Sequence, residues 1–321
     1  IKVPISLLEK RYEFKKGNKL NKRTFADIVL LIVVFIWGAT FVVVQDTIAF
    51  LTPFSFNAIR FFIGFIILVL FYFFFTKKKK AHFNRQSLKA GVTLGVWLFL
   101  GYAFQTFGLL YTTPGKAGFI TGLSVVLVPL FAFLLLKQVL NRNMIIGVVF
   151  ATVGLYMITL LEGSVFTFGD FLVLLCAVSF AMHIVTTGKY ATEHHAVALT
   201  IIQIFTVSVL SLIGSFLHEN PKEMFQLEIL MQPKVINALL ITGILATAFA
   251  FLAQTYFQTY TSATRVALIF AMEPVFAAAT SYFVIGETFT FTMIIGCLFI
   301  FAGIVFSELP IKKTNIEDKV C

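Results

Sequence analysis

Ten stretches of the chain each consist of about 20 mostly apolar residues, the length that crosses the hydrocarbon of a bilayer as a helix. Apolar residues run continuously through each stretch and do not alternate with polar ones, which is typical of transmembrane helices and not of barrel strands. We therefore predict an all-α integral membrane protein with ten transmembrane helices, at residues 26–45, 54–75, 90–110, 117–136, 143–161, 168–187, 197–217, 235–257, 263–285 and 290–307.

Composition and charge place the chain in a bilayer. Hydrophobic residues make up 59% of the sequence and charged residues only 12%, whereas a soluble domain has about 25% charged residues. Lipid is therefore the expected solvent of most of the chain. The net charge of +10 could suit a nucleic-acid-binding protein, but the excess lies in short segments between the apolar stretches. We expect the lipid bilayer as a partner and no nucleic acid.

The basic residues predict the orientation in the membrane. With the N-terminus in the cytoplasm, 21 of the 25 Lys and Arg residues fall on the cytoplasmic side. The outer segments hold only Lys116, Lys222 and Lys234, and Arg60 lies inside a helix. Cytoplasmic loops of membrane proteins carry such an excess of Lys and Arg. We predict a multi-pass protein of the plasma membrane with both termini in the cytoplasm.

The second half of the chain repeats the first. Gln105-Thr106-Phe107 recurs 149 residues later as Gln254-Thr255-Tyr256, and nearer the start of each half the offset is 143 residues. These offsets pair Asp27 with Asp170, Trp37-Gly38 with Phe180-Ala181, Arg60 with Gln203, Tyr111 with Tyr260, and Lys116 with Arg265.

The repeat predicts how the chain is divided. Each half holds five helices, an odd number, so the second half enters the membrane in the opposite orientation. Inverted repeats of this kind are typical of secondary transporters. We predict a basic cytoplasmic tail at 1–25, a first five-helix repeat at 26–161, a second, inverted repeat at 162–308 and a cytoplasmic C-terminal tail at 309–321.

Short motifs in the first, second and ninth helices carry a resemblance: Trp37-Gly38, Pro53 with Arg60, Glu273-Pro274 and Gly286-Glu287. Together with the duplication, they make residues 26–307 resemble the drug/metabolite transporter superfamily, EamA type. The first half departs from the second, because it has Ser124-Val125 and Lys137-Gln138 in place of the two acidic motifs. The resemblance implies a secondary transporter that exports a small solute, such as an amino acid or a drug-like molecule, by alternating access.

Two other classes of function are weighed against transport. A membrane-embedded enzyme would need paired carboxylates, a His/Cys ligand set or a similar constellation. The longest outer loop, residues 218–234, has His218 and Glu219 but no spacing that suits a metal. A non-transporting scaffold or receptor would normally bring a soluble domain. We expect no enzyme, no catalytic residue, no metal and no cofactor, and a small-molecule solute as the partner.

Ionisable residues within apolar stretches are costly, on the order of 3 kcal/mol each at the bilayer centre, and so they indicate function. Glu273 is predicted near the membrane midplane, as a partner for a substrate ammonium or as a proton-binding site. The alternative is a structural carboxylate, protonated or paired with Arg60. Arg60 itself is predicted to bind a substrate carboxylate; the alternatives are an ion pair between helices and extension of its side chain to the outer interface.

Polar residues at repeat-related positions predict further parts of a transport site. Gln105 and Gln254 are predicted to bind substrate. Tyr111 with Lys116, and Tyr260 with Arg265, fall near opposite faces of the membrane, where two gates would close a central cavity. The alternative for all six residues is ordinary polar contact between helices and anchoring at the interfaces.

Trp37 and His183 complete the candidate site. Trp37 lies near the middle of its helix, away from the interfacial belt where Trp is common, and is predicted to line the cavity and stack on the substrate. Packing against lipid or other helices is the alternative. His183 is a candidate proton relay together with Glu273, because imidazole titrates near neutral pH. A hydrogen-bonded structural histidine is the favoured alternative for His183.

Overall fold

The computed structural model describes residues 5–76, 83–112, 114–159, 167–220, 223–285 and 291–308. All regular secondary structure in these ranges is helical, as the apolar pattern predicts. Seven helices are long and apolar enough to cross a membrane, and three shorter apolar helices span Ile120–Leu136, Arg142–Gly154 and Ile294–Phe306. The prediction of an all-helical, multi-pass protein is confirmed in this coarser form, and the count of ten crossings stays a prediction.

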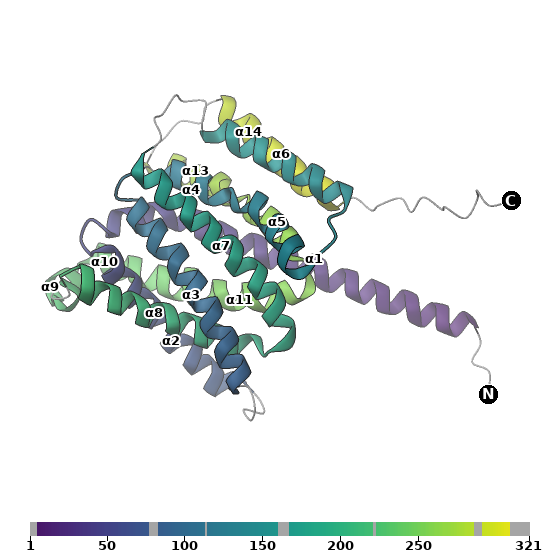
Figure 1. The fold of residues 1–321 in the computed structure, drawn as a ribbon, viewed down its shortest axis with the longest axis horizontal. Coiled ribbons are helices and arrows are strands. Elements are labelled where there is room, and N and C mark those ends of the chain that lie inside the picture. The colour runs from purple at the N-terminus through teal and green to yellow at the C-terminus, as the bar shows by residue number, and fades with distance from the viewer. Residues whose placement is uncertain are drawn as a thin grey trace.

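Seventeen helical segments make up the described chain (Figure 1): α1 (Ile5–Thr47), α2 (Pro53–Phe75), α3 (Arg85–Gly108), α4 (Pro114–Gly122), α5 (Ser124–Leu136), α6 (Arg142–Thr159), α7 (Phe168–Glu193), α8 (Ala196–His218), η1 (Glu223–Phe225), α9 (Leu227–Leu230), α10 (Pro233–Leu240), η2 (Ile241–Phe249), α11 (Ala250–Phe257), η3 (Gln258–Tyr260), α12 (Ala263–Phe270), α13 (Glu273–Ile285) and α14 (Phe291–Glu308). The segment η2 is a π-helix, whereas η1 and η3 are 3₁₀ turns.

Side-chain caps fix where several helices begin. Capping boxes start α3, through Asn84 and Ser87, and α7, through Thr167 and Asp170, so that the free N–H groups of the first turn are satisfied. The cap of α2 comes from a distant residue. The carboxylate of Glu219, just after α8, accepts from the backbone N–H groups of Phe54 and Ser55 at 2.7 and 3.0 Å. This contact joins the start of α2 to the end of α8.

Two of the predicted helices are each broken in the middle. The stretch predicted at 117–136 is divided between α4 and α5 at Leu123, and the stretch predicted at 263–285 is divided between α12 and α13 at Ala271–Met272. At each break the backbone N–H bonds three residues back, Leu123 to Ile120 and Met272 to Ile269, which tightens one turn into 3₁₀ geometry. The two breaks are 149 residues apart, the offset of the repeat.

A π-helix interrupts the region predicted at 235–257. The nine residues of η2 separate α10 from α11, and Gly243 within η2 lies against α2. A Cβ atom at Gly243 would approach the Arg60 carbonyl oxygen to 3.1 Å, and one at Gly64 of α2 would approach the Thr247 side chain to 2.7 Å. Glycine on both sides therefore permits the close packing of α2 on η2. π-Helical turns occur often at functional sites.

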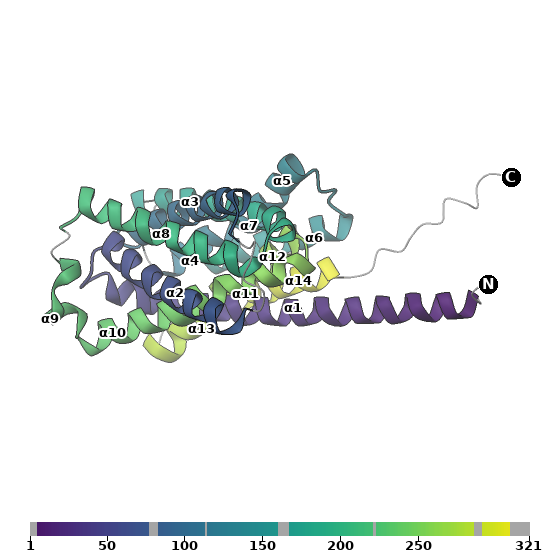
Figure 2. The same ribbon diagram turned by 90° about the horizontal axis from the view of Figure 1, so that it is seen from below.

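Helices α6 and α14 lie side by side along one edge of the bundle (Figure 1). Glycine brings them together, since a Cβ atom at Gly303 would lie 2.6 Å from the Gly147 carbonyl oxygen, and one at Gly154 would collide with the Gly296 carbonyl oxygen. Helix α1 runs along one side of the bundle and extends well beyond it, on the side where α14 ends (Figure 2). Large apolar side chains such as Phe73, Phe74 and Phe75 face outward, as expected in contact with lipid.

Candidate functional site

A cavity inside the bundle is lined by residues from α1, α2, α3, α4, α5, α7, η2, α11, α12 and α13. Its empty volume is about 690 Å³, its open side included. The five residues predicted to bind substrate all line this one cavity, and His183 lines it too: Trp37, Arg60, Gln105, Gln254 and Glu273. The structure therefore brings together residues that are up to 236 positions apart in the sequence, and their roles in binding stay predictions.

Arg60 enters the cavity from α2 and is only 4% exposed. Its guanidinium carbon lies 4.2 Å from the ring centroid of Tyr102 and 4.8 Å from that of Phe61. The Nε and Nη2 atoms are buried and have no hydrogen-bond partner. Extension of Arg60 to the outer interface, one of the alternatives, is therefore wrong for this structure, because the side chain is enclosed by aromatic rings.

Glu273 is the first residue of α13, directly after the break that follows α12. Within the described part of the chain its carboxylate forms no ion pair, so the alternative in which it pairs with Arg60 is wrong for this conformation. The backbone of Glu273 is held closely by α1, since a Cβ atom at Gly38 would lie 2.7 Å from the Glu273 carbonyl oxygen. Glycine at position 38 thus lets α1 approach the break between α12 and α13.

Aromatic side chains form much of the cavity wall: Trp37, Phe41, Tyr102, Phe180, Phe251 and Phe270. The Trp37 ring lies 5.2 Å from Phe251 and 5.1 Å from Phe270, between centroids. Its indole N–H donates to the carbonyl oxygen of Ala246 in η2 at 2.9 Å. The alternative that Trp37 packs against lipid is wrong, because its ring lies on the cavity wall and is fixed in position by this hydrogen bond.

His183 is 2% exposed and joins a buried polar chain. Its Nε2 lies 2.8 Å from Oε1 of Gln203, and Nε2 of Gln203 donates to Oγ1 of Thr255 at 3.1 Å. The bonds join α7, α8 and α11 and agree with the favoured alternative, a structural histidine. Because His183 also lines the cavity, a role in proton relay stays a prediction.

The two repeat-related glutamines have different environments. Gln105 is 8% exposed, and its Nε2 donates to Thr121 Oγ1 at 3.4 Å, a long bond from α3 to α4. Gln254 is 1% exposed, and its Oε1 has no hydrogen-bond partner. An acceptor that is buried without a donor costs about 1–3 kcal/mol. Gln254 therefore offers a free acceptor at the cavity wall.

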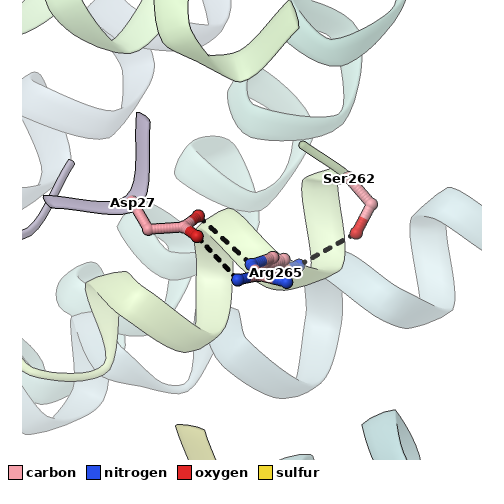
Figure 3. A network of polar contacts seen from close by, with 3 residues as sticks. All are labelled: Asp27, Ser262 and Arg265. Carbon is pink, nitrogen blue, oxygen red and sulfur yellow. Dashed lines mark hydrogen bonds and ion pairs between the residues drawn. The ribbon is translucent and has the colours of Figure 1, made fainter. Parts of the chain in front are cut away.

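Arg265 forms an ion pair that links the two halves of the chain (Figure 3). Its Nη2 and Nε donate to the two carboxylate oxygens of Asp27 in α1, at 2.6 and 3.1 Å. Both side chains are largely buried, with 10% and 19% of their surface exposed for Arg265 and Asp27. Parallel bonds between a guanidinium and a carboxylate are among the stronger polar contacts in proteins. The pair ties α1 to α12.

The predicted gate residues Tyr111, Tyr260 and Arg265 are not among the residues that line the cavity. Tyr111 is 57% exposed and packs edge-to-face with Phe168, at 5.8 Å between ring centroids. Tyr260 is 38% exposed, and its hydroxyl lies 3.3 Å from that of Tyr256. Neither tyrosine closes the cavity directly in this conformation. The side chain of Lys116 and the Gly286-Glu287 motif lie outside the described residues.

Several cavity residues were missed by reasoning from the sequence. Three of them could have been found from the repeat, because Phe180, Thr40 and Ser124 occupy the positions equivalent to Trp37, His183 and Glu273. Others had no such sequence indication. Tyr102, which lies against Arg60, and Ala246, which accepts from the Trp37 indole, are ordinary members of an apolar stretch in the sequence.

Apolar helices that enclose ionisable and polar groups define a multi-pass membrane protein with an internal polar site. The model of the EamA-like transporter family matches residues 24–160 and matches again at residues 167–309. These two segments cover most of the chain, and the chain belongs to this family. It is a membrane transporter by family, and the resemblance noted from its motifs is confirmed.

Curated relatives carry the same broad description. An uncharacterized transporter of Archaeoglobus fulgidus is 35% identical over 295 residues, covering 92% of this chain and 89% of the relative. The uncharacterized transporter YoaV of Bacillus subtilis is 23% identical, covering 89% of this chain and 98% of the relative. A crystal structure with 16% identity superposes with a TM-score of 0.75 over 90% of this chain and 98% of that one, which supports the fold alone.

Proposed function

We propose that the protein is a secondary transporter that exports a small solute, such as an amino acid or a drug-like molecule, by alternating access. The observation that carries this proposal is the single cavity lined by Arg60, Glu273 and uncharged polar groups from both halves of the chain. In a transporter built from inverted repeats, the substrate site lies at the interface between the repeats, often beside broken helices. The cavity has both properties if residues 26–161 and 162–308 are such repeats.

Two further observations support the inverted repeats. The family model matches the chain twice, in consecutive segments of similar length. The breaks between α4 and α5 and between α12 and α13 also fall at equivalent positions of the two halves. Rocking of one half against the other would then expose the same cavity first to the cytoplasm and next to the outside.

Each cavity residue has a proposed role. Trp37, Gln105 and Gln254 contact the solute, Arg60 and Glu273 bind its charged groups, and Glu273 with His183 handles protons in exchange for the solute. With both termini in the cytoplasm, as the charge distribution predicts, the Asp27–Arg265 pair closes the cytoplasmic end. Lys116, at the position equivalent to Arg265, takes the same part at the outer end. Tyr111 and Tyr260 lie beside these two gates.

Substitution of Glu273 tests the proposal. Purified protein in liposomes should show saturable flux of amino acids, metabolites or dyes, and Glu273→Gln should abolish this flux or uncouple it from a proton gradient. The matched control is Glu228→Gln, which removes an exposed carboxylate outside the cavity. Absence of flux for every solute would count against transport. Flux of the Glu273→Gln protein equal to the unmodified one between about pH 5 and pH 8 would remove Glu273 from the mechanism.

A further inference from the structure

Arg60 is a buried cation without an anion. The side chain is 96% buried, it lines the cavity, and its Nε and Nη2 donors have no partner. No described carboxylate forms an ion pair with it, and Glu273, on the same cavity wall, does not reach it in this conformation. Buried charges in proteins are almost always paired and hydrogen-bonded. The cavity therefore holds a positive group whose partner has to come from elsewhere.

The neighbours of Arg60 stabilise its charge, and Tyr102 also forms a side-chain hydrogen bond with it, but two of its donor atoms, Nε and Nη2, stay without a partner. Three aromatic rings, Phe56, Phe61 and Tyr102, have their centroids 5.2, 4.8 and 4.2 Å from the guanidinium carbon. A cation over an aromatic face is attracted by the ring quadrupole, yet the face does not accept the in-plane N–H groups. The rings therefore hold the guanidinium in one place while Nε and Nη2 remain available.

The other half of the chain has no equivalent site. Gln203 occupies the position that matches Arg60, and both ends of its amide are already bonded, to His183 and to Thr255. The repeat-related position therefore has a neutral side chain with both amide atoms bonded, whereas Arg60 has a charge and two donor atoms without partners.

We infer that the transported solute carries a carboxylate that binds Arg60, with an apolar body against the aromatic wall. This inference rests on the proposed function and narrows its substrate class. A planar carboxylate matches the fork of the guanidinium and accepts from two of its donors at once. A phosphate dianion would bring two negative charges to one Arg in a cavity that also contains Glu273. An organic cation without a carboxylate would lie beside Arg60 with the same sign of charge.

Matched probes test the inference by thermal stabilisation of the detergent-purified protein. Phenylacetate, benzylamine, benzyl alcohol and phenyl phosphate share one ring and differ in the charged group, and phenylalanine adds an ammonium to the carboxylate. Phenylacetate and phenylalanine should stabilise the protein, with benzylamine, benzyl alcohol and phenyl phosphate at least tenfold weaker. A binder raises the stability with its concentration relative to its Kd.

Variants of Arg60 make the test specific. Arg60→Gln should weaken binding of phenylacetate by about tenfold to a hundredfold, the range for losing a hydrogen-bonded charge. Arg60→Lys keeps the positive charge but lacks the two parallel donors of a guanidinium, so its affinity for phenylacetate should be intermediate. It provides a second test if Arg60→Gln is unstable. Arg85→Gln makes the same chemical change at an exposed position and should leave binding unchanged.

The outcomes separate this inference from the proposed function. It is overturned if no carboxylate stabilises the protein, if benzylamine or phenyl phosphate binds as well as phenylacetate, or if Arg60→Gln binds phenylacetate as the unmodified protein does. Flux of amines in liposomes that is insensitive to Arg60→Gln would overturn the inference and leave transport intact. Carboxylate binding that depends on Arg60, without flux of any solute, would support the inference and count against transport.

Discussion

Asp27→Asn should open the end of the cavity that the Asp27–Arg265 pair is proposed to close. Asparagine has nearly the shape of aspartate, so the substitution removes the charge and one of the two acceptors without altering the volume. The two bonds of 2.6 and 3.1 Å join α1 to α12. A contact shifts a conformational equilibrium by the difference between its free energies in the two states. If the ion pair forms only in the closed state, its whole contribution is lost from that state, and the open population rises accordingly.

The magnitude follows from burial. Exposed ion pairs contribute up to about 1 kcal/mol, and removal of one partner from a fully buried pair costs about 3–5 kcal/mol. The side chains of Arg265 and Asp27 are 10% and 19% exposed, so the pair lies between these two limits. We therefore expect a loss of about 2 kcal/mol, which corresponds to an open population about 30-fold larger.

Cysteine labelling measures this population. Gln254 is 1% exposed and lines the cavity, so a Gln254→Cys side chain should react with a membrane-impermeant maleimide added on the Asp27 side only when the cavity opens to that side. The three native cysteines are first replaced by alanine: Cys176, Cys297 and Cys321. With the maleimide added on the side of the membrane where Asp27 lies, the labelling rate in Asp27→Asn should be about 30-fold higher than in the protein that keeps Asp27.

The control is Asp46→Asn, which removes an exposed carboxylate near the other end of α1 and should leave the rate unchanged. The charge exchange Asp27→Arg with Arg265→Asp should return the rate towards the starting value. An unchanged rate in Asp27→Asn would refute the reasoning, because the pair would then persist in the open state or make no contribution. An increase of equal size in Asp46→Asn would indicate general loosening of the bundle.

Two predictions concern the structure around the site. Glu219→Ala removes the carboxylate that accepts from Thr52 and from the first N–H groups of α2. Thermal unfolding should show a free energy of unfolding lower by about 1–2 kcal/mol, typical of a lost helix cap, and no decrease in the control Glu228→Ala. Equal decreases in both variants would contradict the capping role. Gly38→Ala places a Cβ atom 2.7 Å from the Glu273 carbonyl oxygen. This overpacking should reduce flux at least tenfold while the protein still inserts into the membrane. Unchanged flux would show that α1 and α13 separate freely.

The helical fold and the ionisable and amide residues of the cavity could be predicted because the bilayer makes polar groups expensive. A residue such as Arg60 or Gln254 within an apolar stretch must face the protein interior, and ten such stretches have one common interior. The same rule selected Trp37, Glu273 and Gln105, and all five line the cavity. Polar residues in lipid-soluble helices are thus informative even when their partners are unknown.

The aromatic wall and the helix irregularities were not predictable in this way. The chain has 40 Phe residues, and a Phe that faces lipid has the same sequence surroundings as one that faces the cavity, such as Phe251 or Phe270. The break at Met272 is followed by Pro274, in the first turn of α13, but no proline lies close to the break at Leu123 or within the π-helix η2. They depend on how neighbouring helices pack, which local sequence does not encode.

The ion pair could not be predicted either. The repeat relates Asp27 to Asp170 and Lys116 to Arg265, but it gives equivalence between halves and not contact across them. The structure places Asp27 of the first half against Arg265 of the second. Contacts between halves depend on how the two units dock, which the sequence of a single chain, read by itself, does not encode.

Helix α1 is continuous from Ile5 to Thr47, so it would tilt as one rigid body. Its close contact with the Glu273 backbone at Gly38 is a pivot point, and Asp27 lies 11 residues away, about 16 Å along the axis. A tilt of roughly 10° about that point would carry Asp27 by about 3 Å, more than a hydrogen bond can stretch. A solute that tilts α1 about its contact with the Glu273 segment would thus separate Asp27 from Arg265.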